Sequence, residues 1–507
     1  MKKIILVYVT LFLSLSIAKA EVFHYEILQE YSISDIGNDI NHFMDLASPN
    51  DTIIVTGSKI NVTQTLELRF SKEVYIIWQA TFQSNAAFDN HAYPFLLGIS
   101  EKGIFEIAGG TLSSVSAHTL RVNNGVRLIV SGNTKIHASG KIFPYDYEAV
   151  AIYVGYMGGE IVEIKEDAQI SSLGNSAILL NGDNQTITIS GGSITSKNGS
   201  ALTISGRGSK AIVSGGYLSN KATNQQFSTI KAYVDYEGSI HISGNAVVEA
   251  KELASAIVSE GSVYVSGNAK VSAQNRYAIS SNLNVTVSGN SIIEAKNNTI
   301  AIYCKWSDVE INDQAQVIAA NNYAVSYEDY HYPPVLNGGL LFAYGKNISD
   351  VIDYPYFIEP TFSGVVLAWD KAAGNLQYTK FSTKDIFKAP PTATAYWDEK
   401  NGKFGISYAN NNNTGFIPID AISLSVSEYS FSKPIVFPNP TTGVIYISSE
   451  QADEWTSIEI FDVYGRKLYS YPRSLVHSST TSIDISHLPS GIYFVRVNNE
   501  TVKVVKQ

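Results

Sequence analysis

Two short stretches of the chain place acidic side chains among aromatic ones. The first stretch contains Tyr145, Asp146, Tyr147, Glu148 and Tyr153, and the second contains Tyr327, Glu328, Asp329 and Tyr330. Aromatic rings flanked by hydrogen-bonding carboxylates are typical of protein contacts with sugars. We therefore predict that these residues bind a ligand. The alternative is that both stretches are polar loops whose tyrosines pack back onto the protein.

Other side chains that could carry chemistry are few. Cys304 is the only cysteine and follows Tyr303 in an apolar stretch, so we interpret its thiol as a small buried apolar group. His241 and His331 stand alone, without metal-ligand spacing. The sequence has no Gly-x-Ser-x-Gly motif, no Cys-x-x-Cys motif and no phosphate-binding glycine loop. We predict no metal site, no cofactor and no catalytic residue.

The elements that must hold these residues follow from a pattern that occurs three times, in residues 239–251, 262–274 and 284–296. Each copy has an apolar alternation, then Ser-Gly-Asn, then a second apolar alternation. Alternation with period two predicts β-strands with one buried face. Gly and Asn tolerate left-handed backbone, so Ser-Gly-Asn predicts a sharp corner between the two strands.

The same corner recurs along the chain at steps of about two dozen residues. We mark each copy by the residue before the corner glycine, or its equivalent: Ala108, Ser131, Glu166, Ser190, Ser214, Ser243, Ser266, Ser288 and Asn312. Two longer steps, at 131–166 and 214–243, are interpreted as insertions. A third apolar element, such as Ala278 with Ile279, lies between corners. Three short strands in each coil predict an all-β fold, a right-handed parallel β-helix solenoid.

A leucine-rich repeat would have a similar period. Here, however, the inward positions hold β-branched residues such as Val263, Val265 and Val271, and no amphipathic helix fits between the corners. Such residues favour strands. In this repeat, residues 51–337 resemble the pectin-lyase-like superfamily of parallel β-helix proteins. The resemblance implies the fold and implies no particular activity.

Catalytic acids on such a solenoid would occupy one column in neighbouring coils, which stack about 4.8 Å apart. The column two residues before the marker reads Glu106, Ile129, Ile164, Thr188, Ile212, His241, Tyr264, Thr286 and Glu310. The column six residues after the marker contains Glu249 and Glu294, two coils or roughly 10 Å apart. A hydrolase needs two carboxylates about 5–9.5 Å apart, so we favour an ordinary solvated surface over an inverting pair.

Two segments before the repeats have signals of their own. Residues 1–20 contain two N-terminal lysines, an apolar run and Ala18-Lys19-Ala20, which predict a cleaved secretory signal peptide. In residues 34–47, Ile36, Ile40 and Phe43 recur at helical spacing. We expect this amphipathic helix to cap the first coil, within a domain of residues 21–337.

The corner pattern ends after the repeats. In residues 338–425, two similar sequence segments surround Trp369 and Trp397. Each segment combines an apolar alternation with adjacent Gly and Asn. We predict hairpins in a small antiparallel β module and a linker at residues 426–433. We expect both tryptophans in the core of this module, and the alternative is that they are platforms for sugar rings.

The last segment, residues 434–507, contains four motifs in order. The first three include Pro438, Asn439, Pro440 and Gly443, then Gly465, then Gly491 and Tyr493, and the fourth is a basic end. In these motifs the segment resembles the C-terminal sorting domain of type IX secretion cargo. The resemblance implies a small antiparallel β-sandwich, recognition by the type IX secretion machinery, a Gram-negative bacterium of the Bacteroidetes type and export across the outer membrane.

Composition limits the partners. The net charge is −10 and the pI is about 5.5, which disfavours nucleic acid. After signal cleavage, no stretch reaches the roughly 18 consecutive apolar residues that a transmembrane helix needs.

These observations predict a secreted or cell-surface protein that is non-catalytic and is adhesin-like or glycan-binding. Its expected partners are the type IX secretion machinery and a glycan or host surface. The alternative is a secreted polysaccharide lyase or glycoside hydrolase. That alternative requires a column of acids beside a cationic base, and the sequence does not show such a column.

Overall fold

The computed structural model describes residues 20–85, 88, 94–142, 147–156, 158–297, 299–320, 322–328, 334–344, 348–353, 365–369, 379–380, 393–398, 403–410, 413–418, 435–437, 439, 441–448, 457–463, 466–472, 480–497 and 500–507. The signal peptide predicted for residues 1–20 lies outside the described residues, apart from Ala20.

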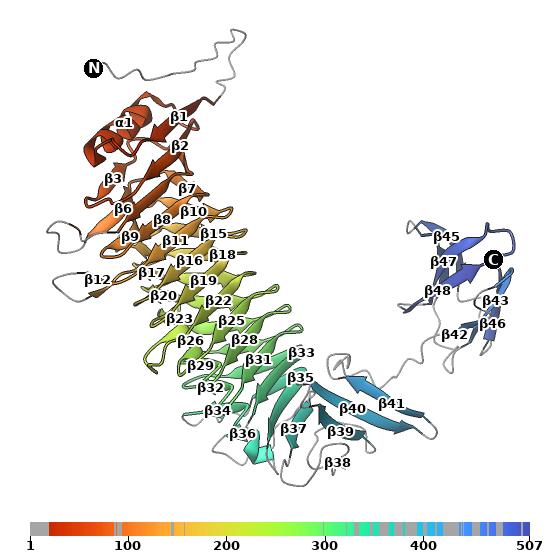
Figure 1. The fold of residues 1–507 in the computed structure, drawn as a ribbon. Helices are drawn as coiled ribbons and strands as arrows, with labels where there is room; N and C mark the ends of the chain where they lie inside the picture. The colour runs from red at the N-terminus through yellow and green to blue at the C-terminus, as the bar shows by residue number, and fades with distance from the viewer. Residues whose placement is uncertain are drawn as a thin grey trace. The chain divides into compact units, whose positions relative to one another are not determined.

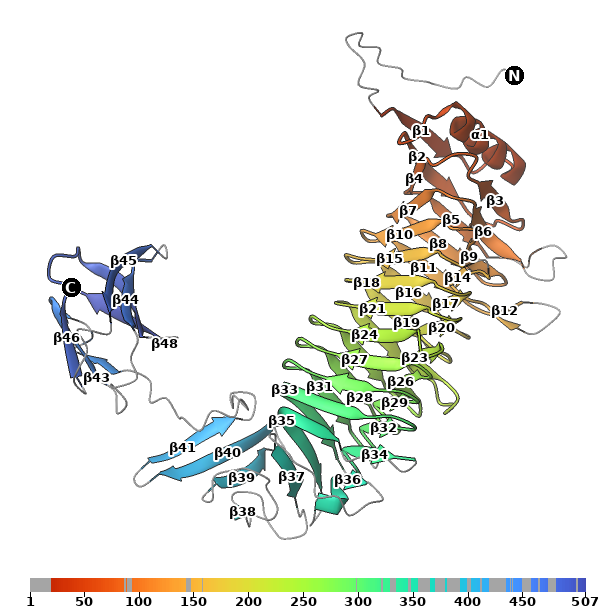
Figure 2. The same cartoon turned by 180° about the vertical axis from the view of Figure 1, so that it is seen from behind.

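Each coil forms because alternate apolar residues turn inward. In the coil that begins at Ser239, Ile240, Ile242 and Val248 are fully buried. Successive coils pair as parallel strands, with Ile240 opposite Val263 and Val248 opposite Val271. One core of Ile, Val, Leu and Ala side chains runs along the stacked coils. The predicted parallel β-solenoid is confirmed (Figures 1 and 2).

The first two strands of each coil belong to one 23-stranded sheet. The first strands are β1 (Val22–Ile27), β2 (Thr52–Lys59), β4 (Tyr75–Trp78), β7 (Ile104–Ala108), β10 (Arg127–Ser131), β15 (Ile161–Ile164), β18 (Thr186–Ile189), β21 (Lys210–Val213), β24 (Ser239–Ile242), β27 (Ser262–Val265) and β30 (Val285–Val287). The second strands are β5 (Thr81–Ser84), β8 (Thr111–Ser114), β11 (Lys135–Ala138), β16 (Gln169–Ser172), β19 (Ser193–Ser196), β22 (Tyr217–Asn220), β25 (Val247–Ala250), β28 (Lys270–Ala273) and β31 (Ile292–Ala295). Three longer strands complete the sheet: β33 (Val309–Ala319), β35 (Val335–Tyr344) and β37 (Val365–Trp369).

The third strands form a separate 12-stranded parallel sheet, with one strand from each coil. They are β3 (Leu66–Arg69), β6 (Phe95–Ser100), β9 (His118–Val122), β14 (Ile152–Val154), β17 (Ile178–Asn181), β20 (Leu202–Ser205), β23 (Ser228–Tyr233), β26 (Ser255–Ser259), β29 (Ile279–Ser281), β32 (Ile302–Cys304), β34 (Val325–Tyr327) and β36 (Ile352–Asp353). We call the outward surface of this sheet the third-strand face, and that of the second strands the second-strand face.

The Ser-Gly-Asn corners stack in a line, as predicted. Gly244, Gly267 and Gly289 have φ values of 59°, 68° and 66°, in the left-handed region that strains residues with a β-carbon. The Asn268 side-chain amide donates a hydrogen bond to the Asn245 side chain at 3.2 Å, and Asn290 donates to Asn268 at the same distance. Glycine therefore supplies the bend, and asparagine ties each corner to the next.

The predicted register is wrong by one residue at one corner. Glu166 has a φ of 59°, so it occupies the left-handed position that glycine fills in most corners. Ile164 pairs with Val130 and with Ile189, so the marker position of this coil belongs to Lys165. The column predicted to contain Ile164 contains Glu163 instead, opposite Ile129. The alignment was misplaced here because this corner has Glu166 rather than a glycine to mark its position.

The predicted N-terminal helix is present as α1 (Ile33–Leu46). Ser32 caps it: the Asp35 amide donates to the Ser32 hydroxyl at 3.0 Å, and the Asp35 carboxylate accepts from the Ser32 amide at 3.3 Å. Its buried face includes Ile36, Ile40 and Phe43. The sequence did not predict β1, which precedes the helix and pairs in parallel with β2.

The parallel ladder continues beyond residue 337, where we expected it to end. β35 pairs with β33, and β37 pairs with β35, so Trp369 lies on a parallel strand rather than in the predicted hairpin. The apolar run of residues 365–369 matches that of residues 340–344 position by position, which allows this pairing. Around Trp397 the hairpin prediction is confirmed, because β39 (Ala393–Asp398) and β40 (Lys403–Asn410) pair antiparallel. β38 (Thr379–Lys380) and β41 (Asn413–Pro418) complete this four-stranded sheet.

The chain divides into two compact units, residues 1–426 and 427–507. The second unit contains a three-stranded antiparallel sheet of β42 (Ile435–Phe437), β43 (Val444–Ser448) and β46 (Thr480–Asp484). Its other antiparallel sheet consists of β45 (Lys467–Pro472), β44 (Ser457–Phe461), β47 (Gly491–Val497) and β48 (Glu500–Lys506). Ile445 and Ile483 from the first sheet share one core with Ile458 and Val495 from the second. This arrangement is the small antiparallel sandwich that the motifs implied.

Candidate functional site

The first predicted ligand-binding stretch includes one strand of a short hairpin. β12 (Lys141–Ile142) and β13 (Tyr147–Glu148) pair antiparallel, so Tyr147 and Glu148 lie on one strand of the hairpin. Glu148 is half-buried and lies close to Gly174, where a β-carbon would come within 2.6 Å of the Glu148 side chain. Tyr145 and Asp146 lie outside the described residues.

Tyr153 belongs to an aromatic stack on the third-strand face. Its ring centroid lies 5.6 Å from that of His118, nearly parallel to it, and 6.1 Å from that of Phe95. The Asn181 amide donates to the Tyr153 hydroxyl at 3.2 Å. Burial raises the pKa of Tyr153 to about 12, so the phenol stays protonated and can donate a hydrogen bond. Tyr153 is therefore held in place by its neighbours while the residue remains partly exposed.

An arginine and a glutamate adjoin this stack. The Arg121 guanidinium lies 4.2 Å from the centre of the Phe95 ring and forms an ion pair with Glu67 at 2.6 Å. Gly98 lies between them in the register, and a β-carbon there would come within 2.6 Å of the Glu67 carboxylate. A glycine at this position therefore gives the glutamate room to reach the arginine. We call Glu67, Phe95, His118, Arg121 and Tyr153 the aromatic–arginine cluster.

His118 and Phe95 are the two buried members of this cluster. The Val150 amide donates to Nδ1 of His118 at 3.0 Å, so the neutral ring carries its proton on Nε2. Burial lowers the pKa of His118 to about 4. The imidazole is therefore uncharged at neutral pH and acts as a flat ring on which Tyr153 stacks.

The sequence alone indicated only Tyr153 among these five residues. Glu67 and Arg121 come from coils two turns apart, and their meeting depends on the register and on Gly98. Chemically, the cluster offers a ring face, a planar cation and a carboxylate on one outward surface. That set can stack on a sugar ring and hydrogen-bond its hydroxyl groups.

The second predicted stretch is only partly assembled. Tyr327 is 6% exposed and packs in the solenoid core, so we leave it out of the proposed site. Glu328 forms an ion pair with Lys305 at 3.1 Å, and Lys305 also lies 4.8 Å from the ring centre of the exposed Trp306. Asp329 and Tyr330 lie outside the described residues, as does His331.

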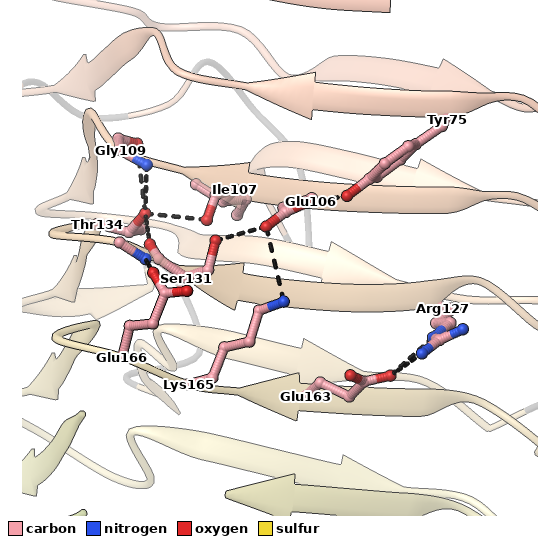
Figure 3. A network of polar contacts seen from close by, with 11 residues as sticks. Tyr75, Glu106, Ile107, Gly109, Arg127, Ser131, Thr134, Glu163, Lys165 and Glu166 are labelled. Atoms are coloured by element: carbon pink, nitrogen blue, oxygen red, sulfur yellow. Dashed lines mark hydrogen bonds and ion pairs between the residues drawn. The ribbon is translucent and has the colours of Figure 1, made fainter. Parts of the chain in front are cut away.

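With the register corrected, an acid, a lysine and a tyrosine come together on the first-strand side of the solenoid (Figure 3). Glu106 accepts a hydrogen bond from Tyr75 and another from the Ser131 hydroxyl at 2.5 Å, and Lys165 lies 4.0 Å away. Both carboxylate oxygens are thus engaged, and the Glu106 side chain is only 13% exposed. The network joins four successive coils. Glu106 therefore has a structural role and is not a free catalytic base.

The corners of these coils are joined in the same way. The Glu166 carboxylate accepts from the Gly132 amide at 2.8 Å. Thr134 accepts from the Gly109 amide at 2.7 Å and donates to the Ile107 carbonyl at 3.0 Å. On the nearby strands, Glu163 accepts from Nε of Arg127 at 2.7 Å (Figure 3). These bonds satisfy polar groups at the coil edges, so they account for the network without a ligand.

Glu249 and Glu294 share a column with Ser272 between them, as predicted. The Glu249 carboxylate accepts from the Tyr217 hydroxyl at 2.7 Å. Lys251 and Lys296 lie 3.7 and 3.6 Å from it. Glu249 is therefore bound by its neighbours rather than paired with Glu294 across a reaction site.

Within the described residues, no group of three or more His, Cys, Asp or Glu side chains could hold a metal ion. Cys304 is buried, and its thiol donates to the carbonyls of Leu283 and Ser307. Burial raises the pKa of Cys304 to about 11, which keeps the thiol protonated and poorly nucleophilic.

The sorting motif residues hold the second unit together. The Asn439 side chain donates to the Lys503 carbonyl at 2.7 Å and accepts from the Val505 amide at 2.9 Å, which ties the opening motif to β48. The Tyr493 hydroxyl donates to the Pro489 carbonyl at 2.7 Å. A β-carbon on Gly443 would lie 2.8 Å from that of Ser486, and Gly491 begins β47. Pro438, Pro440 and Gly465 lie outside the described residues.

Comparison with known families identifies this second unit. Residues 435–507 match the family model of the secretion system C-terminal sorting domain. No curated protein and no solved structure matched the chain. None of the described helices is long and apolar enough to cross a membrane. The match establishes how the chain is exported and leaves the role of the solenoid to be argued from its surfaces.

Proposed function

We propose that this β-solenoid protein, which a type IX secretion sorting domain directs across the outer membrane, is a non-catalytic, adhesin-like protein that binds a glycan at its aromatic–arginine cluster. The observation that carries the proposal is the juxtaposition of stacked rings with an Arg121–Glu67 ion pair on one outward face. The stack positions the rings before any ligand arrives, which lowers the entropic cost of binding.

The chemistry of the cluster supports a sugar as the ligand. Tyr153 offers an aromatic face and a protonated hydroxyl, which suit the apolar face and the hydroxyl groups of a sugar ring. Arg121 and Glu67 supply a donor and an acceptor beside that face. Tyr145, Asp146, Tyr147 and Glu148, which precede Tyr153 in the chain, extend the proposed contact surface.

Binding is favoured over cleavage because Glu67, the one carboxylate among the five residues of the aromatic–arginine cluster, is already held by Arg121. Glycoside hydrolysis needs two carboxylates with separate roles. The second acidic group with a lysine and a tyrosine, around Glu106, is fully engaged in bonds between coils. A lyase or hydrolase therefore stays the alternative proposal.

Replacing the ion pair with neutral isosteres tests the proposed site. We expect Glu67→Gln with Arg121→Gln to weaken glycan binding by about tenfold or more, because charge-assisted hydrogen bonds contribute about 1.5–3 kcal/mol each. The matched control is Arg127→Gln with Glu163→Gln, which removes a similar ion pair from the first-strand side of the solenoid. The measurement is a glycan array followed by titration of the best ligand, with the full chain.

The same samples are assayed for new reducing ends and for unsaturated products. Equal binding by both double variants would overturn the proposed site. Product formation by the unmodified chain would overturn the non-catalytic assignment in favour of the lyase or hydrolase. Circular dichroism checks that each variant keeps its β-sheet content.

A further inference from the structure

Lysines form a column along the edge of the second-strand face. Asn220 pairs with Ser196 and with Ala250, so the residues that follow them, Lys221, Lys197 and Lys251, lie side by side. The pairing of Ala250 with Ala273 and of Ala273 with Ala295 adds Gln274 and Lys296. Five successive coils thus carry four lysines at one position.

Backbone hydrogen bonds hold this column in register. The Lys221 amide donates to the Ser196 carbonyl at 3.1 Å, and the Lys251 amide donates to the Asn220 carbonyl at 3.1 Å. The Lys296 amide donates to the Ala273 carbonyl at 2.9 Å. Coils stack about 4.8 Å apart, so the backbone positions of the column extend over roughly 19 Å along the solenoid.

The charge of this column is only partly neutralised. Lys251 and Lys296 share the Glu249 carboxylate, which also accepts from Tyr217. Lys197 and Lys221 are exposed, and neither forms an ion pair with any residue that the structure describes. Lys270 adds a further exposed cation on β28. A local excess of positive charge on a chain of net charge −10 indicates an anionic partner.

The surface beside the column is hollowed. An open pocket of about 600 Å³ spans β16 and β19, and its mostly polar lining includes Asp167, Gln169 and Ser193. A second pocket of about 210 Å³ spans β25, β28 and β31, and its lining includes two lysines and two acids, Lys270, Lys296, Glu249 and Glu294. Tyr217, on β22, lies on the strand series between the two pockets.

We propose that the second-strand face binds a linear polyanionic glycan, whose carboxylate or sulfate groups contact the lysine column while its sugar rings lie over the two pockets and Tyr217. A linear polymer fits because the four lysine positions follow one direction across five stacked coils. A compact ligand would contact only one or two of them. This site lies on a different face from the aromatic–arginine cluster, and the proposal does not depend on that cluster.

Charge reversal of the two exposed lysines tests the column. The probes are heparin, which carries sulfates, polygalacturonate, which carries carboxylates, and neutral dextran. We expect Lys197→Glu with Lys221→Glu to weaken binding of the preferred polyanion by about tenfold or more. The slope of log affinity against log salt should become shallower by about 1.4, since each lost contact with a single-stranded polyanion accounts for about 0.7. Full-length protein is used throughout.

The matched control is Lys102→Glu with Lys210→Glu, which makes the same change in net charge at exposed positions away from the second-strand face. The control should bind as the unmodified protein does. Glu67→Gln with Arg121→Gln should also leave polyanion binding unchanged, which separates this proposal from the proposed function. Comparing heparin with polygalacturonate identifies which anionic group is preferred.

Three results would overturn the proposal. The first is equal loss of binding in the lysine variant and its control, which would indicate a net-charge effect. The second is equal binding of dextran and the polyanions. The third is tighter binding of a single-stranded oligonucleotide than of either polyanionic glycan, which would assign the column to nucleic acid. Circular dichroism confirms that the lysine variant is folded before any loss is interpreted.

Discussion

His118 illustrates how a single side chain can serve binding by remaining uncharged. It lies among Phe95, Tyr153 and the strand backbone, where water cannot solvate an imidazolium ion. A charged ring would also lose the acceptor that Nδ1 offers to the Val150 amide. The stack that positions Tyr153 therefore requires the neutral form of His118.

This burial makes part of the stability depend on pH. Because the folded pKa of His118 is about 4 and the usual value is 6.5, the unfolded chain binds more protons between these limits. The contribution is fully present above about pH 6.5 and is lost as the pH falls towards 4, by about 3 kcal/mol in total. We expect His118→Gln, which keeps an acceptor but does not titrate, to reduce the loss of unfolding free energy over this window. Parallel pH profiles of variant and unmodified protein in urea unfolding would contradict this.

At the scale of the element, each corner depends on its glycine. A β-carbon on Gly267 would lie 2.8 Å from the Gly244 backbone nitrogen, in addition to the strain of a φ of 68°. We expect Gly267→Val to lower the free energy of unfolding by about 1–3 kcal/mol or more. Denaturant unfolding followed by circular dichroism measures this effect.

A control for the corner prediction is available on the same coil. Lys270 is exposed on β28, and Lys270→Val places the same side chain on a strand, where β-branched residues are favourable. That variant should keep nearly full stability. A Gly267→Val variant as stable as the control would show that the corner tolerates a side chain.

The sequence predicted the coils well because their causes are local. Alternating Ile and Val residues give the strands, and glycine with asparagine gives the corners. At Trp369 a local hairpin signal was overridden by parallel pairing with β35, and two other errors occurred where local signals were missing. At one corner Glu166 stands where most corners have a glycine, and no pattern before the helix indicated β1.

Most of the candidate site could not be predicted in the same way. Glu67 and Arg121 are 54 residues apart and meet only because two coils stack across Gly98. The lysine column needs the register of five coils at once, including the coil at Lys221, which precedes one of the long insertions. Tyr153 could be indicated from sequence because aromatic composition is visible without knowing any neighbour.

At the scale of the whole molecule, the solenoid and the sorting domain are separate units with separate cores. We expect deletion of residues 434–507 to leave a folded solenoid that stays in the periplasm, because the sorting domain is lost while the core of the solenoid is intact. Cell fractionation with limited proteolysis measures both location and folding. If the truncated protein reached the cell surface at normal levels, this domain would not be required for export.

The near-identity of neighbouring coils has a consequence for how such a protein changes over generations. Val248, Val271 and Ile293 occupy one inward column, and Ala250, Ala273 and Ala295 occupy another. If recombination between the repeated gene segments removed the middle copy, Val248 would meet Ile293 and Ala250 would meet Ala295, and the core would close with equivalent partners. Duplication would be accommodated in the same way. The length of the solenoid can therefore change by whole coils during evolution. The number of binding positions along its faces would change with the number of coils.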